Sequence, residues 1–151
     1  IFRTHLNKMT DKNYIDCINK IVDEIDKIIS NNIDSNDLIQ ISLNIFEIAS
    51  TNRFFSKIYA DLYSDLFLKY EFMRTIFEDS FNKFIGLFSV IDYINPEEDY
   101  DKFCKINKDN EKRRSLSVFF INLMKNEIIN KDKIVQLLKT LLLQIVKVAG
   151  N

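Results

Sequence analysis

Glycine and proline are scarce in this chain, which has 2 Gly and 1 Pro among 151 residues. β-Sandwiches and α/β folds need repeated tight turns, and such turns place Gly, Asn-Gly or Pro at set positions. Long helices joined by polar Asn, Asp and Ser loops need few of these residues. Hydrophobic residues make up 46% of the chain, including 13 Phe, so a sizeable core is possible. The composition therefore predicts an all-α protein.

Histidine is nearly absent too, because His5 is the only one. This excludes a multi-histidine metal site and an HExxH helix, and a nucleophilic relay would depend on His5 itself. With Gly86 and Gly150 as the two glycines, the sequence has no Gly-rich loop that could wrap phosphates. We therefore expect no catalytic residues, no metal and no cofactor, and the chain is predicted not to be an enzyme.

Paired acidic motifs are missing as well. The helical acid clusters are Asp23-Glu24 with Asp26, and Glu78-Asp79. They lack the ExxE or ExxD spacing that stacks carboxylates on one helix face. Solvated helix faces explain these clusters, while an all-α hydrolase that works with carboxylates and Mg²⁺ stays open as the least favoured function.

A large net charge of one sign is absent, since the formal net charge is −1. RNA contact would therefore need a local patch. Cys17 and Cys104 show no ligand spacing and are interpreted as small buried hydrophobes in a reducing compartment. Neither a membrane-spanning run nor a signal peptide is visible, so a cytoplasmic location is expected. The chain opens at Ile1 instead of Met, so we expect its natural N-terminus to lie upstream.

Apolar residues three or four positions apart predict six helices in three antiparallel pairs, over about 11–51, 53–93 and 111–149. A charged loop is expected over 95–110, and a short helix inside it is the alternative. Thr10 and Asn130 are predicted helix caps, and Gly86 is expected to permit close approach of a neighbouring helix. A period of about forty to fifty residues favours a HEAT-type α-solenoid. A four-helix bundle with extra helices would show a similar rhythm and stays open.

Three segments resemble the middle domain of translation initiation factor 4 gamma. Residues 6–10 (LNKMT) are similar to the LNKLT start of the family's first HEAT helix, with Met9 in place of Leu. Residues 54–63 (FFSKIYADLY) resemble its F-x-x-x-YA-x-LC stretch, with Tyr63 in place of Cys. The segment beginning at Lys112-Arg113-Arg114 resembles RRRSLGNIKFIG, with Ser117 and Asn122 in place of glycines.

The resemblance implies a scaffold that binds a DEAD-box RNA helicase of the initiation factor 4A type, and also mRNA and other initiation factors. The family domain has about five helix pairs, so three pairs imply either that later repeats follow Asn151 or that this is a shortened version. The abundance of Ile, Asn and Lys suggests an AT-rich genome, as in a protist or a large DNA virus. A scaffold of mRNA decay or deadenylation with the same domain, and an adaptor unrelated to translation, are the alternatives.

By the same resemblance, the expected helicase contacts lie at the start of the chain. They are apolar at Phe2, Leu6 and Met9, and polar at Asn7 and Lys8. The alternative for Leu6 and Met9 is a hydrophobic staple that closes the first helix, and for Lys8 it is simple solvation.

The expected RNA contacts are Lys112, Arg113 and Arg114, because cations at a helix start are poorly placed against its dipole unless they bind phosphate. Pairing with the acidic residues of 97–101 is the alternative. The Phe stripe from Phe72 to Phe88 is interpreted as core and not as a base-stacking surface.

Overall fold

The computed structural model describes residues 2–31 and 35–150, and at Phe2 and Ser35 it describes the backbone alone. Across these residues the chain consists of α-helices, two 3-10 turns and connecting segments, with no strand. The all-α prediction is confirmed. In the described part of the chain, no helix is long and apolar enough to cross a membrane.

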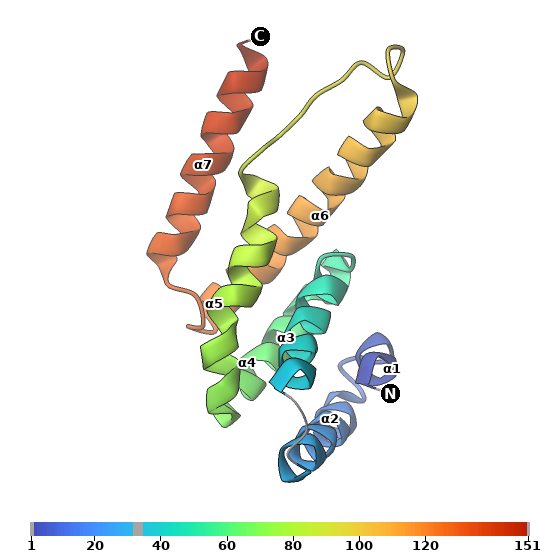
Figure 1. Cartoon of the computed structure of the whole chain (residues 1–151), viewed down its shortest axis with the longest axis vertical. Helices are drawn as coiled ribbons and strands as arrows, with labels where there is room; N and C mark the ends of the chain where they lie inside the picture. The colour runs from blue at the N-terminus through green and yellow to red at the C-terminus, as the bar shows by residue number, and fades with distance from the viewer. Residues whose placement is uncertain (1, 32–34, 151) are drawn as a thin grey trace.

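The elements follow one another along the chain with short connections, apart from one long crossing between η2 and α6 (Figure 1). In order they are α1 (Phe2–Asn7), α2 (Tyr14–Ser30), α3 (Ser35–Ala49), η1 (Arg53–Phe55), α4 (Ser56–Lys69), α5 (Glu71–Ile85), η2 (Gly86–Phe88), α6 (Tyr100–Lys125) and α7 (Lys131–Ala149).

Helices two positions apart along the chain make the largest packing contacts. Helix α4 packs along α6, and α3 packs along α5. Smaller contacts join α2 to α4, and also join sequential neighbours such as α4 and α5. The last helix, α7, contacts α6 and η2 and reaches α5 through the ion pair of Lys133 with Glu78, and most of it extends away from the other helices at one end of the molecule (Figure 1). The centre of the fold therefore lies between α3, α4, α5 and α6.

A cluster of aromatic rings fills this centre around Phe46 of α3. Phe46 is fully buried and meets the rings of Tyr63, Phe84 and Phe119 at centroid distances of 5.3, 5.4 and 5.3 Å. Such edge-on and offset ring pairs contribute about 0.5–1.5 kcal/mol each beyond the area they bury. Most of the predicted Phe stripe takes part, since Phe77, Phe84 and Phe88 are buried.

A polar network lies inside the same core. The hydroxyl of Ser42 lies 3.0 Å from the hydroxyl of Tyr63 and 2.9 Å from that of Ser80. Burial raises the pKa of Tyr63 above its ordinary value. The three residues come from α3, α4 and α5, so one hydrogen-bonded group ties three helices together. A buried hydroxyl without a partner is costly, and this network removes that cost.

Helix α6 departs most from expectation. The charged segment 95–110 was predicted to be a loop, but the helix begins at Tyr100, where Asp99 accepts a hydrogen bond from the backbone N–H of Lys102 at 2.9 Å. A side-chain oxygen in this position satisfies one of the free N–H groups of a helix start. Helix α6 therefore begins at residue 100 instead of about 111, and Lys112 lies in the middle of it.

Three smaller expectations were wrong. Helix α2 begins at Tyr14 and not just after Thr10, and Thr10 donates its N–H and hydroxyl to Oδ1 of Asn13. Gly86 caps the end of α5. A Cβ at this position would meet nothing within 4 Å, so no neighbouring helix packs closely against Gly86. Cys104 is exposed, although Cys17 is buried as predicted. The Asn130 cap of α7 is confirmed, with its side chain accepting from the N–H of Asp132.

Candidate functional site

The three segments that carry the family resemblance meet one another in the fold. The hydroxyl of Tyr59, in the second segment, donates to the carbonyl oxygen of Leu6, in the first, at 3.3 Å. The side-chain amide of Asn122 reaches the hydroxyl of Ser56 at 3.5 Å, and α4 packs along α6. The segments therefore form one continuous part of the molecule, built mainly from α1, α4 and α6.

Most of the motif residues are structural. In the second segment Tyr59, Ala60, Leu62 and Tyr63 are buried, and in the third Leu116, Phe119 and Phe120 are buried. Their spacing therefore reports how the helices pack. The residues that could contact a partner are the exposed ones beside them.

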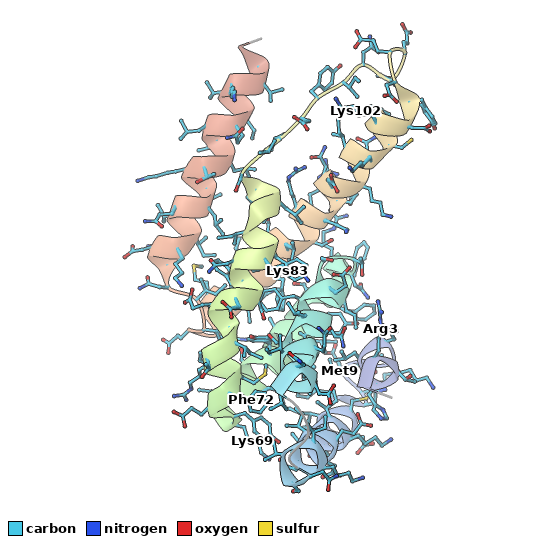
Figure 2. The ribbon with its side chains drawn as sticks, viewed as in Figure 1. Arg3, Met9, Lys69, Phe72, Lys83 and Lys102 are labelled. Carbon is cyan, nitrogen blue, oxygen red and sulfur yellow. The ribbon has the colours of Figure 1, made fainter. Side chains whose placement is uncertain are left out.

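Two of the predicted helicase contacts are exposed and two are buried. Asn7 ends α1 and Lys8 follows it, and both are exposed to solvent. Leu6 and Met9 are 0% and 3% exposed, and Met9 lies where α1 meets α3 (Figure 2). Their burial anchors α1 to the core, so a partner could reach them only if α1 moved away. The side chain of Phe2 lies outside the described residues.

The turn after α1 is held by side-chain hydrogen bonds. The amide of Asn13 donates to the carbonyl oxygen of Lys8 at 2.8 Å, while its Oδ1 accepts from the N–H of Thr10 at 2.6 Å. His5 lies 3.3 Å from a carboxylate oxygen of Glu24 on α2. These contacts and the buried Leu6 and Met9 hold the exposed Lys8 in a defined place.

A second exposed segment, at η1, is joined to the end of α1 through Tyr59. Burial raises the pKa of Tyr59, and the side chain of Asn52, in hydrogen-bonding contact with the Tyr59 hydroxyl, opposes that rise. The same hydroxyl contacts the carbonyl oxygen of Leu6. One buried tyrosine thus brings the end of α1 next to the start of η1. We give the name edge surface to four exposed residues of these two segments, Asn7, Lys8, Arg53 and Phe54, and Phe55 beside them is exposed as well.

Phe54 is the most distinctive member of the edge surface. It is 87% exposed, the largest value among the exposed large hydrophobic residues of the described chain, and the Arg53 guanidinium lies 5.5 Å from its ring centroid. Exposed aromatic and arginine side chains are the types that most often dominate binding energy at protein interfaces. The sequence placed Phe54 in a motif but did not identify it as a contact, because spacing alone does not reveal that Phe54 and Phe55 both face solvent.

The predicted RNA patch is largely engaged within the fold. Arg113 donates to the carbonyl oxygens of Leu87 and Val90 and, at 2.7 Å, to Oδ1 of Asn110. It therefore closes the end of η2 and does not pair with the acidic residues of 97–101. Arg114 pairs with Glu111, one turn earlier on α6. Lys112, Arg113 and Arg114 were expected to bind phosphate because they would stand at a helix start. This reason does not hold, since all three lie in the middle of α6.

A polar hollow formed by residues of α2, α4 and α6 was not predicted from the sequence. The hydroxyl of Tyr14 donates to Oδ2 of Asp65 at 2.6 Å. The pKa of Tyr14 is raised, mainly by burial and secondly by this hydrogen bond to the Asp65 carboxylate. The amide of Asn126 donates to Asp61 and to Ser64, both at 3.0 Å. The four-residue spacing of Asp61 and Asp65 was a usable signal. Because these carboxylates accept hydrogen bonds from their neighbours, the hollow acts as a connection between helices.

Among the residues that the structure describes, no three His, Cys, Asp or Glu side chains gather in a way that could hold a metal ion. Comparison with known proteins adds no relative: no family model, no curated protein and no solved structure matches this chain. The edge surface is therefore chosen on geometry, on exposure and on the resemblance of its motifs.

Proposed function

We propose that this chain is a HEAT-type scaffold of translation initiation that binds a DEAD-box RNA helicase of the initiation factor 4A type through the edge surface. The observation that carries the proposal is the junction at Tyr59, whose hydroxyl contacts Leu6 and Asn52 and so joins two segments that each carry exposed residues, Lys8 in one and Phe54 in the other. A cytoplasmic location is part of the same proposal.

The packing of alternate helices supports the solenoid part of the proposal. In stacked helix pairs, the first helices of successive pairs pack together, and so do the second helices. Here α4 lies along α6, and α3 lies along α5. Three pairs, α2 with α3, α4 with α5, and α6 with α7, would follow that order.

A scaffold of this kind acts by binding one conformational state of its partner better than another. A ligand shifts a conformational equilibrium only by its difference in affinity for the two states. The buried anchors Leu6 and Met9 and the Asn13 hydrogen bonds hold the edge surface in one shape. A fixed surface loses less entropy on binding, which favours the helicase arrangement that fits it.

Isothermal titration calorimetry with a purified helicase of this type tests the proposal. Phe54→Ser should weaken binding by roughly 30-fold or more, as expected for an aromatic hot spot. Lys8→Glu should weaken it less and mainly at low salt. Leu142→Asp, at the opposite end of the chain, is the matched control and should bind like the unmodified chain. Binding that Phe54→Ser and Lys8→Glu leave unchanged would remove the edge surface from the proposal.

RNA binding stays a narrower, second proposal. Arg113 is committed to carbonyl oxygens, so Lys112 and Arg114 are the members of the patch that could meet phosphate. A Lys112→Glu/Arg114→Glu variant should lose salt-sensitive binding to a single-stranded RNA. If the unmodified chain binds no RNA, or tightly binds a protein unrelated to helicases, the general adaptor function would be favoured.

A further inference from the structure

Positive charge is concentrated at the C-terminal end of the chain. Residues 111–149 carry eight Lys and Arg against three Asp and Glu, a net charge of +5. The remaining residues carry thirteen against nineteen, a net charge of −6. The near-neutral total therefore hides a basic end formed by α7 and the second half of α6, which would attract an acidic partner.

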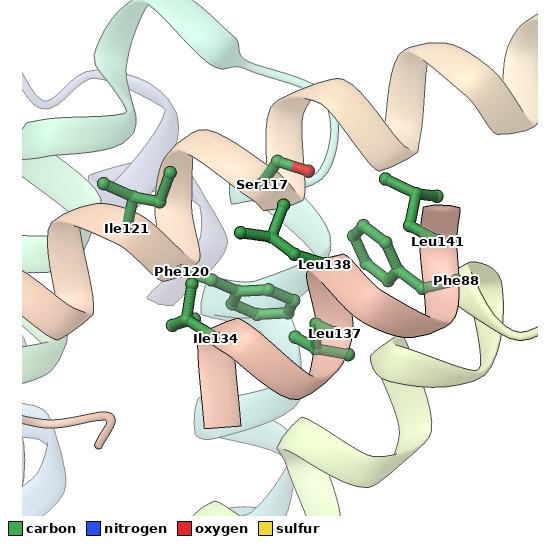
Figure 3. A pocket seen from close by; sticks show the side chains of 8 residues that line it. All are labelled: Phe88, Ser117, Phe120, Ile121, Ile134, Leu137, Leu138 and Leu141. Atoms are coloured by element: carbon green, nitrogen blue, oxygen red, sulfur yellow. The ribbon is translucent and has the colours of Figure 1, made fainter. Parts of the chain in front are cut away.

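Helix α7 is apolar on two sides. Its inward side carries Ile134, Leu137 and Leu141, which lie against Phe88 and Phe120 (Figure 3). Its outward side carries apolar residues that are largely exposed: Val135 37%, Leu138 53%, Leu142 59%, Ile145 48% and Val146 68%. A helix that is hydrophobic around most of its circumference is normally covered on both sides.

Helix α6 continues this exposed surface. Ile121 is 40% exposed and borders the same hollow as Leu138, on the neighbouring helix (Figure 3). One turn earlier on the same face, Val118 is also exposed. Ile121 and Leu138 line one hollow of this surface, and Leu142 and Val146 line another. We call the exposed apolar residues of the two helices the C-terminal groove: Val118, Ile121, Val135, Leu138, Leu142 and Val146.

Lysines border the groove. Lys139 lines one apolar hollow together with Leu142 and Val146. Lys131 lies four residues before Val135, and Lys125 lies four residues after Ile121, which places each on the face of its helix that carries the groove residues. All three lysines are exposed. The groove therefore has an apolar floor and a basic rim.

We propose that the C-terminal groove binds an amphipathic helix of a separate partner protein, with an apolar stripe that enters the groove and acidic residues on its flanks. Apolar anchors three or four residues apart are how a helix fills such a groove. The basic rim selects acidic flanks and disfavours a second copy of this chain, whose own lysines would then face these lysines. The apolar floor disfavours RNA, whose backbone is charged throughout.

Two synthetic peptides of about three heptads test this proposal, both with Leu at positions a and d. One has Glu at e and g, and its twin has Lys there. Fluorescence anisotropy at low salt should show the Glu peptide binding the full chain at least about tenfold more tightly than the Lys peptide. Lys131→Glu/Lys139→Glu should abolish or reverse this preference. Leu142→Asp should eliminate binding of the Glu peptide, whereas Leu68→Asp, at a residue that is 67% exposed on α4, should leave it unchanged.

Several results would overturn the proposal. Equal binding of the two peptides, or no binding of either, would exclude an acidic helix. A dimer in sedimentation velocity that becomes a monomer in Leu142→Asp would show that a second copy covers the groove. Circular dichroism verifies that Leu142→Asp still folds, and if its helix signal falls, Val146→Asp replaces it, because Val146 is 68% exposed. Because no helicase is present in these assays, their outcome is independent of the edge surface.

Discussion

The aromatic centre and the last helix use similar residues to opposite effect. Around Phe46, rings from α3, α4, α5 and α6 enclose one another, and Phe46 itself is fully buried. In α7, Ile134 is the one buried residue, although apolar residues extend along most of the helix. Both regions have helical apolar spacing. The difference lies in how many helices surround each one, and spacing within a single helix does not encode that number.

This comparison separates stability from binding. Burying a large apolar side chain contributes about 1.5–3 kcal/mol, and the aromatic centre collects many such contributions. Exposed apolar residues of α7 contribute little to the folding stability of the isolated chain. They would contribute to binding free energy when a partner covers them. We therefore expect substitutions to have large effects on folding in the centre, and large effects on binding but small effects on folding in α7.

The largest expected effect is that of Phe46→Ala. Removing a fully buried ring that contacts five other rings leaves a cavity, and such changes cost about 3–5 kcal/mol. Urea denaturation followed by circular dichroism should show the loss. A cost below about 1 kcal/mol would mean that the aromatic centre is not the main source of stability.

The next effect is a loss of stability in alkaline solution that depends on Tyr63. Burial raises its pKa in the folded state, whereas in the unfolded chain it ionises near pH 10. Its contribution is complete below pH 10 and declines as pH rises further, by at most about 1.4 kcal/mol per pH unit. In urea titrations at several pH values, the stability difference between the unmodified chain and Tyr63→Phe should stay constant up to pH 9 and change above 10. A constant difference up to pH 11 would contradict the buried position of this hydroxyl.

Loss of the α7 cap should have a moderate effect confined to one end. Asn130→Ala removes the side-chain oxygen that accepts the N–H of Asp132, and such losses cost about 1 kcal/mol. Hydrogen exchange should accelerate at amides of α7 and stay unchanged in α4. Asn130→Gly, which preserves the backbone conformation of a cap, should cost only a few tenths of a kcal/mol and serves as the control. Faster exchange throughout the chain would show that α7 unfolds together with the aromatic centre.

The smallest folding effect is expected from Leu142→Ala. Leu142 is 59% exposed, and surface substitutions away from special features change stability by about 0.5 kcal/mol or less. The contrast with Phe46→Ala is the direct comparison of the two regions by the same urea measurement. A cost near 2 kcal/mol would mean that the outward side of α7 is already covered in the isolated chain.

Part of the fold was predictable because apolar spacing and caps are local signals. The stripe of α2 includes Ile21 and Ile25, which are both fully buried, and Asn130 caps α7 as predicted. The start of α6 was missed because its first turns extend into solvent and carry charges in place of an apolar stripe. The Asp99 cap was the available signal.

The candidate site was less predictable. Leu6 and Met9 were expected to contact a partner because their segment resembles the family's LNKLT segment, yet the packing of α1 buries them. Arg113 was expected to meet phosphate or the preceding acids, yet it closes η2 through the carbonyl oxygens of Leu87 and Val90. Both outcomes depend on contacts between residues far apart in the sequence.

The most direct test of the scaffold proposal is hydrogen exchange of the chain with and without a helicase of the initiation factor 4A type. We predict slower exchange at residues 7–12 and 52–55, which surround the edge surface, and unchanged exchange in α7. Unchanged exchange throughout the chain, or protection confined to α7, would contradict helicase binding at the edge surface.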